Sequence, residues 1–90
     1  MRRIERRLFA LNDEIAALEG DVLLAEEELN YHRHLDDDTQ RDAVVSGTPI
    51  DRDDARQTAG DVRRFKLHIA QLRRKRAVLR GKRDRLVKKL

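Results

Sequence analysis

The sequence contains no cysteine, a single proline and only 3% aromatic residues. Without cysteine the chain can form no disulfide framework, thiol nucleophile or cysteine-based zinc site. No apolar run approaches the roughly 20 residues needed to span a bilayer, and no apolar signal region stands at the N-terminus. We therefore expect a cytoplasmic protein that does not enter a membrane and that has too few large apolar side chains for a broad globular core.

The residues needed for catalysis or metal binding are also scarce. Ser46 is the only serine, and neither a nucleophile with its base nor a phosphate-binding glycine loop can be recognised. His32, His34 and the aspartates at 36–38 lack a second histidine pair or a cysteine, so we interpret them as a solvated acidic helix end rather than a metal site. We expect a protein that is not an enzyme, holds no metal and requires no cofactor.

Charge is abundant and unevenly distributed. Asp, Glu, Lys and Arg make up 42% of the chain, and the net charge is +4. Counted by segment, residues 1–35 carry −3, residues 36–61 carry −5 and residues 62–90 carry +12. The sequence therefore predicts an acidic arm and an acidic turn beside a basic arm. The block at 73–89 would attract phosphates but has no aromatic side chain for base stacking, so we expect at most nonspecific contact with nucleic acid.

Apolar residues recur in alternating steps of three and four along two stretches. This is the spacing of a coiled-coil seam, in which positions a and d of a seven-residue repeat, labelled a to g, face the partner helix. The first seam contains Ile4, Leu8, Leu11, Ile15, Leu18, Val22, Ala25 and Leu29. The second contains Val62, Phe65, Ile69, Leu72, Arg76, Leu79, Arg83, Leu86 and Leu90, with Ala55 and Thr58 before it. The two are mirror images about Gly47, since the numbers of facing residues sum to 94. This symmetry predicts an all-α fold, an antiparallel two-helix coiled-coil hairpin.

Turn residues occur as one cluster at 46–49. Within and after it, Thr48, Pro49 and Asp51 form a common helix start, with a capping hydroxyl, a proline in the first position and an acid in the first turn. We therefore expect a single hairpin with a helix over about 2–43, a turn over about 44–48 and a second helix over about 49–89. Beyond Leu29 the first seam becomes polar, so we expect looser pairing near the turn.

Charged residues at the flanking positions g and e support the antiparallel register, in which g faces g and e faces e. The predicted pairs are Glu14 with Lys82, Asp21 with Lys75, Glu28 with His68, Glu19 with Arg73 and Glu26 with Lys66. Two seam positions are arginines, Arg76 and Arg83. We expect their methylenes to cross the seam toward Glu14 and Glu19, and the alternative is that they are held ready for an anionic partner.

The first helix is also apolar on the side away from the seam. Its b and c positions hold Phe9, Ala10, Ala16, Ala17, Leu23, Leu24 and Tyr31. A surface helix is normally charged there, so an apolar stripe of this kind predicts an interface. We expect the four largest of these side chains to bind either a second copy of the chain, in a four-helix assembly, or a different protein. They are Phe9, Leu23, Leu24 and Tyr31.

Two stretches carry a family resemblance. Residues 26–33, in the run Glu-Glu-Glu-Leu-Asn-Tyr-His-Arg, and residues 72–86, which are rich in Arg and Leu, resemble the RsiG-type anti-sigma factors of actinobacteria. The resemblance implies an antiparallel two-helix coiled coil that holds a WhiG-type sigma factor with the help of cyclic di-GMP. The ligand motif of that family reads E-x-x-x-S-x-x-R-x-x-x-Q-x-x-x-D.

This chain matches the ligand motif in part. The first copy would be Glu26, Asn30, Arg33, Asp37 and Arg41, which keeps the glutamate and the arginine, has asparagine in place of serine and lacks the glutamine and the final aspartate. The second would be Ile69, Arg73, Arg76, Arg80 and Asp84, of which only Arg76 and Asp84 match the motif. The resemblance implies that these are nucleotide-binding residues, and arginine can both stack on guanine and hold phosphate.

Three functions are compatible with these features. The first is a non-enzymatic regulatory hairpin that binds a transcription protein such as a sigma factor, with cyclic di-GMP as a ligand. The second is a self-associating structural coiled coil, a homodimer whose apolar backs pair. The third is an acidic-tip hairpin resembling GreA and DksA, whose aspartates at 36–38, 42, 51, 53 and 54 would reach into RNA polymerase and hold its magnesium.

Overall fold

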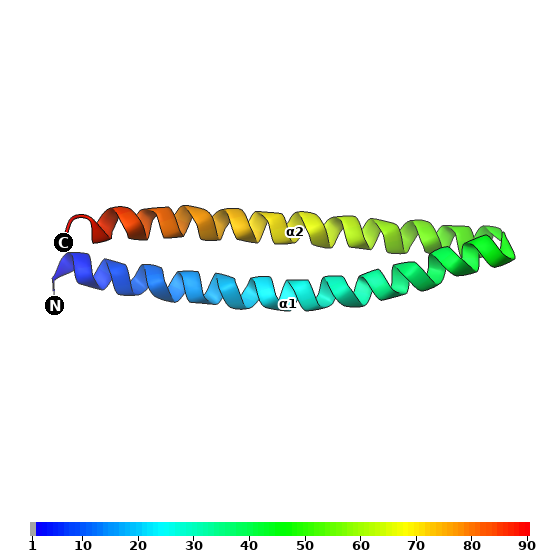
Figure 1. Cartoon of the computed structure of the whole chain (residues 1–90), viewed down its shortest axis with the longest axis horizontal. Helices are drawn as coiled ribbons and strands as arrows, with labels where there is room; N and C mark the ends of the chain where they lie inside the picture. The colour runs from blue at the N-terminus through cyan, green and yellow to red at the C-terminus, as the bar shows by residue number, and fades with distance from the viewer. Residues whose placement is uncertain (1) are drawn as a thin grey trace. The chain divides into compact units, whose positions relative to one another are not determined.

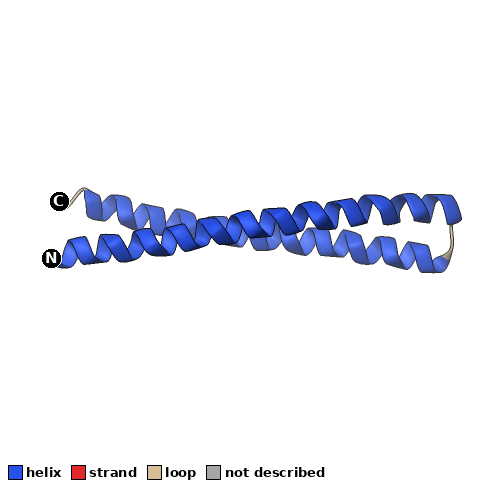
Figure 2. Ribbon diagram, turned by 90° about the horizontal axis from the view of Figure 1, so that it is seen from below, coloured by secondary structure: helices blue, strands red, loops and turns tan. Residues whose placement is uncertain are grey.

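The computed structural model describes residues 2–90, which form two long helices (Figure 1). Helix α1 comprises Arg3–Ser46 and helix α2 comprises Pro49–Val87. Within residues 2–90 there is no strand, and the two helices are joined by a short link (Figure 2). The predicted all-α helical hairpin is therefore confirmed. The four-helix assembly stays a prediction, because it concerns a second chain.

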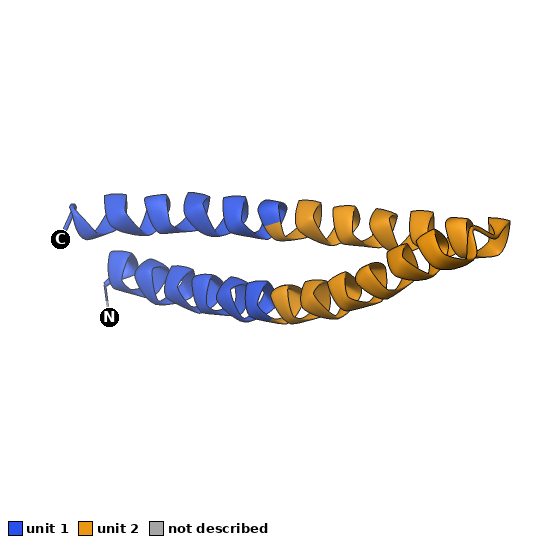
Figure 3. Cartoon of the chain, turned by 45° about the vertical axis from the view of Figure 1, so that its right-hand side comes forward, with its two compact units in different colours: residues 1–23, 70–90 blue, residues 24–69 orange. Residues whose placement is uncertain are grey.

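The chain divides into two compact units, each of which takes one segment from α1 and one from α2 (Figure 3). We call residues 1–23 and 70–90 the terminal unit and residues 24–69 the turn unit. The two segments of each unit run antiparallel, because one belongs to the helix before the turn and the other to the helix after it. The core of each unit lies between its two segments.

The buried residues of both units are seam residues. Each is 8% exposed or less. In the terminal unit they are Leu11, Ile15, Val22 and Leu72, and in the turn unit they are Ala25, Leu29, Ala55, Val62 and Ile69. The mirrored heptad pattern therefore identified the core. It was wrong at Leu90, which is 68% exposed because α2 ends at Val87 and leaves the last residues outside the helix.

The connection between the helices is tighter than expected. Helix α1 continues to Ser46, where the amide of Gly47 still donates to the carbonyl of Ala43 at 3.0 Å. Gly47 then takes a φ of 63°, in the left-handed region that glycine enters without steric cost. The next helix is capped as predicted, because the amide of Asp51 donates to Thr48 Oγ1 at 3.3 Å. The turn is therefore only residues 47–48.

We expect opposite effects from alanine at two glycines. Gly20 lies inside α1 with nothing within 4 Å of an added Cβ, so Gly20→Ala should raise the free energy of unfolding by about 0.5–1 kcal/mol. Gly47→Ala forces a Cβ into the left-handed region and should lower it by about 1–2 kcal/mol. Urea unfolding followed by circular dichroism measures both. If both substitutions changed the free energy of unfolding by the same amount in the same direction, the left-handed conformation of Gly47 would be contradicted.

The polar part of the seam, in the turn unit, is held by hydrogen bonds rather than left loose. The hydroxyls of Thr39 and Thr58 lie 2.6 Å apart across the two helices, and Thr58 donates to the carboxylate of Asp36 at 2.9 Å. The ring of His32 stacks on that of Phe65 with 4.6 Å between centroids. The looser pairing expected here is therefore replaced by a polar layer, because the seam's polar side chains satisfy one another.

Candidate functional site

Four large apolar side chains of α1 point away from its partner helix, as the heptad positions predicted. Phe9 and Leu23 belong to the terminal unit, and Leu24 and Tyr31 belong to the turn unit. Each is between 58% and 63% exposed. We call these four the outward apolar residues of α1. Only Tyr31 has a ring contact, an edge-to-face approach to His32 with 5.5 Å between centroids.

The spacing within each unit places these residues in short lines. In the terminal unit Phe9, Ala16 and Leu23 are all exposed and are seven residues apart, so they follow one edge of the helix. In the turn unit Leu24 and Tyr31 are also seven residues apart. Apolar side chains that line one edge and touch no core of their own are typical of a surface that binds another helix.

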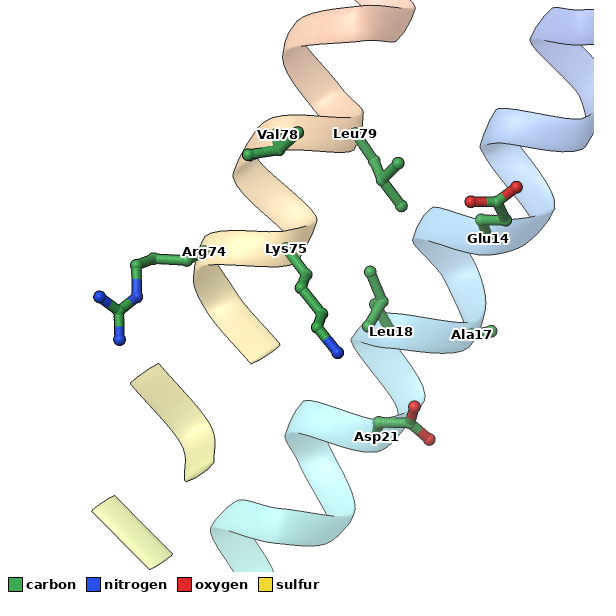
Figure 4. Close-up of a pocket in the computed structure, with 8 residues that line it drawn as sticks. All are labelled: Glu14, Ala17, Leu18, Asp21, Arg74, Lys75, Val78 and Leu79. Atoms are coloured by element: carbon green, nitrogen blue, oxygen red, sulfur yellow. The ribbon is translucent and has the colours of Figure 1, made fainter. Parts of the chain in front are cut away.

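The terminal unit also contains an open groove of about 580 Å³ between α1 and α2 (Figure 4). It lies on the side of the g positions. Its lining residues are Glu14, Ala17, Leu18 and Asp21 from α1 and Arg74, Lys75, Val78 and Leu79 from α2. Figure 4 shows Leu18 and Leu79 pointing into the space between the helices and Lys75 extending toward α1. The groove therefore has an apolar floor, an acidic α1 edge and a basic α2 edge.

Sequence reasoning missed this groove. Ala17 was assigned to the back of the first helix, and Val78 is a single apolar residue at its heptad position, with Gln71 and Arg85 one repeat before and after it. The signal was present, because both stand at c positions, which adjoin the g side of their helices. Ala17 and Val78 carry small or apolar side chains on facing helices, so they leave open space beside the g residues. That space exists only when the two helices are paired.

The flanking charges are arranged differently from the predicted pairs. Arg80 Nη2 donates to the carboxylate of Glu19 at 2.6 Å, where Arg73 had been predicted as the partner. Arg83 contacts the neighbouring Asp84 at 3.4 Å and does not reach Glu14. The ion pairs expected of Arg76 and Arg83 with Glu14 and Glu19 are therefore not formed within residues 2–90, although both arginines are half-buried at their seam positions. Arg80 reaches Glu19 more directly, because its e position already flanks the seam.

The candidate nucleotide-binding residues fall in separate units. In the turn unit Glu26 is half-buried, whereas Asn30 and Arg33 are exposed. In the terminal unit Arg76 and Arg80 are half-buried, whereas Arg73 and Asp84 are exposed. Arg80 forms an ion pair with Glu19, and Asp84 forms one with Arg83. Within residues 2–90 neither Arg33 nor Arg76 takes part in an ion pair, so these two arginines of the set can accept an anion, the first from an exposed position and the second from a half-buried one.

A second feature that sequence reasoning missed lies at the turn. Val44, Val45 and Ile50 are 85%, 87% and 73% exposed, so none of them contributes to the core. The sequence signal for this exposed apolar group was the presence of three branched aliphatic residues close to Gly47 that belong to neither seam. Acidic residues surround them, including Asp51, whose carboxylate accepts a hydrogen bond from Ser46.

Other site classes have no counterpart in the described part of the chain. Among residues 2–90 no group of three or more His, Cys, Asp or Glu side chains is placed to hold a metal ion. No helix in this range has the length and apolarity to cross a membrane. Comparisons with protein-family models, with characterised proteins and with solved structures found no match to the chain.

Proposed function

We propose that this chain is a non-enzymatic regulatory hairpin that captures a protein partner on the outward apolar residues of α1. The observation that carries the proposal is their exposure, since each is more than half exposed on a helix whose seam side is already covered by α2. Burial of apolar surface contributes about 25 cal/mol per Å². A partner helix that lays its own apolar face along Phe9 and Leu23 of the terminal unit, or along Leu24 and Tyr31 of the turn unit, would bury them without disturbing the hairpin.

A transcription protein is the partner class that we propose. The resemblance of residues 26–33 and 72–86 to RsiG-type anti-sigma factors supports a sigma factor in this role. Cyclic di-GMP is proposed as a ligand of the complex. The half-buried Arg76 supports this idea, because its guanidinium has no ion-pair partner within residues 2–90 and could hold a phosphate or stack on a guanine.

Affinity purification from the host cell tests this function. The tagged full chain would be used as bait with and without added cyclic di-GMP. We expect one protein to co-purify in stoichiometric amount and to bind the chain again when both are pure, with higher yield when the nucleotide is present. Replacing Arg73, Arg76 and Arg80 by alanine should remove the nucleotide effect and leave the basal capture.

Two outcomes contradict different parts of the proposal. If millimolar cyclic di-GMP produces no heat in calorimetry and no change in yield, the nucleotide is not a ligand, and a protein partner remains. If the chain captures no protein that rebinds in pure form, the outward apolar residues of α1 are not a partner-binding surface.

A further inference from the structure

The groove of the terminal unit has edges of opposite charge. Glu14 and Asp21 stand on the α1 edge, and Arg74 and Lys75 stand on the α2 edge. All four side chains are exposed, and none of them takes part in an ion pair within residues 2–90. The floor between them is apolar. An occupant of this groove should therefore bring apolar side chains to the floor, a basic edge to α1 and an acidic edge to α2.

We propose that the groove is the contact surface for a second copy of this chain, in a two-fold dimer. The same groove on a second copy has the features that the occupant needs, because it carries one acidic and one basic edge on either side of an apolar floor. A two-fold axis parallel to the helices lays α1 of one copy over α2 of its partner, so that each acidic edge meets a basic edge. An axis perpendicular to the helices would place acid over acid, and charge repulsion disfavours it.

This orientation makes a specific packing prediction. In the register that sums to 94, Ala17 is level with Ala77, which is next to Val78 on α2. The parallel axis preserves these levels, so Val78 of one copy lies over Ala17 of the other. Val78 is 56% exposed in the single chain, and the small side chain at Ala17 leaves room for it. A larger side chain packed over a smaller one is how facing helices interdigitate in bundles.

The dimer surface differs from the partner surface proposed above. In the terminal unit Phe9 and Leu23 occupy b positions, on the e side of α1, whereas the groove lies on the g side. Leu24 and Tyr31 occupy c positions but belong to the turn unit, so they do not line the groove. The inference therefore does not rest on the proposed function, and each can fail alone. Leu23→Glu should leave the dimer intact.

A charge-reversal pair tests the dimer. The first variant is Glu14→Lys with Asp21→Lys, which makes both edges basic, and the second is Arg74→Glu with Lys75→Glu, which makes both edges acidic. We expect the wild-type chain to dimerise with a dissociation constant of about 10 µM in sedimentation velocity. Each variant alone should associate at least about tenfold more weakly, and an equimolar mixture should form a one-to-one heterodimer.

Mixing separates contacts between chains from contacts within one chain. Any attraction between α1 and α2 of the same hairpin is lost in both variants, and mixing cannot restore it. Recovery in the mixture therefore reports only the contact between copies. A wild-type chain that stays monomeric at ten times the expected dissociation constant would overturn the proposal, and so would a mixture that associates no better than its components.

Cysteine crosslinking gives a second test that leaves the charges unchanged. A chain with Ala17→Cys would be mixed with a chain carrying Val78→Cys, so that only bonds between chains can form. We expect the mixed disulfide to exceed the disulfide between two Ala17→Cys chains. If Ala17→Cys chains crosslink mainly with one another, the two-fold axis is perpendicular to the helices and the proposed arrangement is wrong.

Discussion

Replacing Ile15 by alanine will lower the free energy of unfolding by about 2–4 kcal/mol. Ile15 is 4% exposed and occupies the centre of the seam in the terminal unit. The substitution removes three carbon atoms from between two helices that have no other layer to fill the space, so the lost burial and the cavity both destabilise the fold. Urea unfolding followed by circular dichroism at one fixed protein concentration measures the change.

Leu23→Ala is the matched control for this prediction. Leu23 lies on the same helix and in the same unit, but it is 63% exposed. Its truncation should change the free energy of unfolding by no more than about 0.5 kcal/mol. If Ile15→Ala and Leu23→Ala lower the free energy of unfolding by similar amounts, the side chain at position 23 is part of a core, and the heptad assignment of α1 is wrong.

Much of the fold was predictable because the seam repeats at a fixed period in both halves of the chain. Val22 and Leu72 illustrate this: each is buried, and each was identified only by its spacing and its mirror position. Leu90 was not predictable from the same pattern, because a seam position buries its side chain only while the helix continues around it. Where α2 ends depends on local hydrogen bonds that the spacing does not contain, such as those from the amides of Lys89 and Leu90 to the carbonyls of Leu86 and Val87.

The charges were harder to predict than the core. Two arginines, Arg73 and Arg80, occupy successive e positions of α2, and Glu19 pairs with the second of them. A long arginine side chain can extend along the helix in either direction, so position alone does not decide which ion pair forms. Arg80 and Glu19 keep 42% and 45% of their side-chain surface exposed. Solvent screening limits such an ion pair to about 1 kcal/mol or less, so neither choice affects the fold.

The candidate surfaces were predictable only where they belong to one helix. The exposure of Phe9 and Leu23 follows from the heptad positions of α1 alone. The groove requires both helices, because Ala17 and Val78 line one space only after the register and the side of each helix are fixed. For the same reason Val44 escaped notice, since its exposure depends on how tightly the chain turns at residues 47–48.

Two matched variants, Leu23→Glu and Leu67→Glu, test most directly whether α1 carries a protein-binding surface. The measurement is their binding to the purified partner. Leu23 and Leu67 are both 63% exposed, the first on the outward side of α1 and the second on α2. Glutamate is as good a helix former as leucine, so neither substitution should reduce helicity. Each variant therefore differs from the wild type only in the chemistry of one exposed position.

In calorimetry with the partner isolated by affinity purification, we expect Leu23→Glu to weaken binding by about 30-fold or more, because a charge would be buried without a partner in the complex. Leu67→Glu should bind within about threefold of the wild type, because a change outside the interface costs little. If Leu23→Glu binds as tightly as the wild type, or if Leu67→Glu is the variant that fails, the partner does not dock on the outward apolar residues of α1.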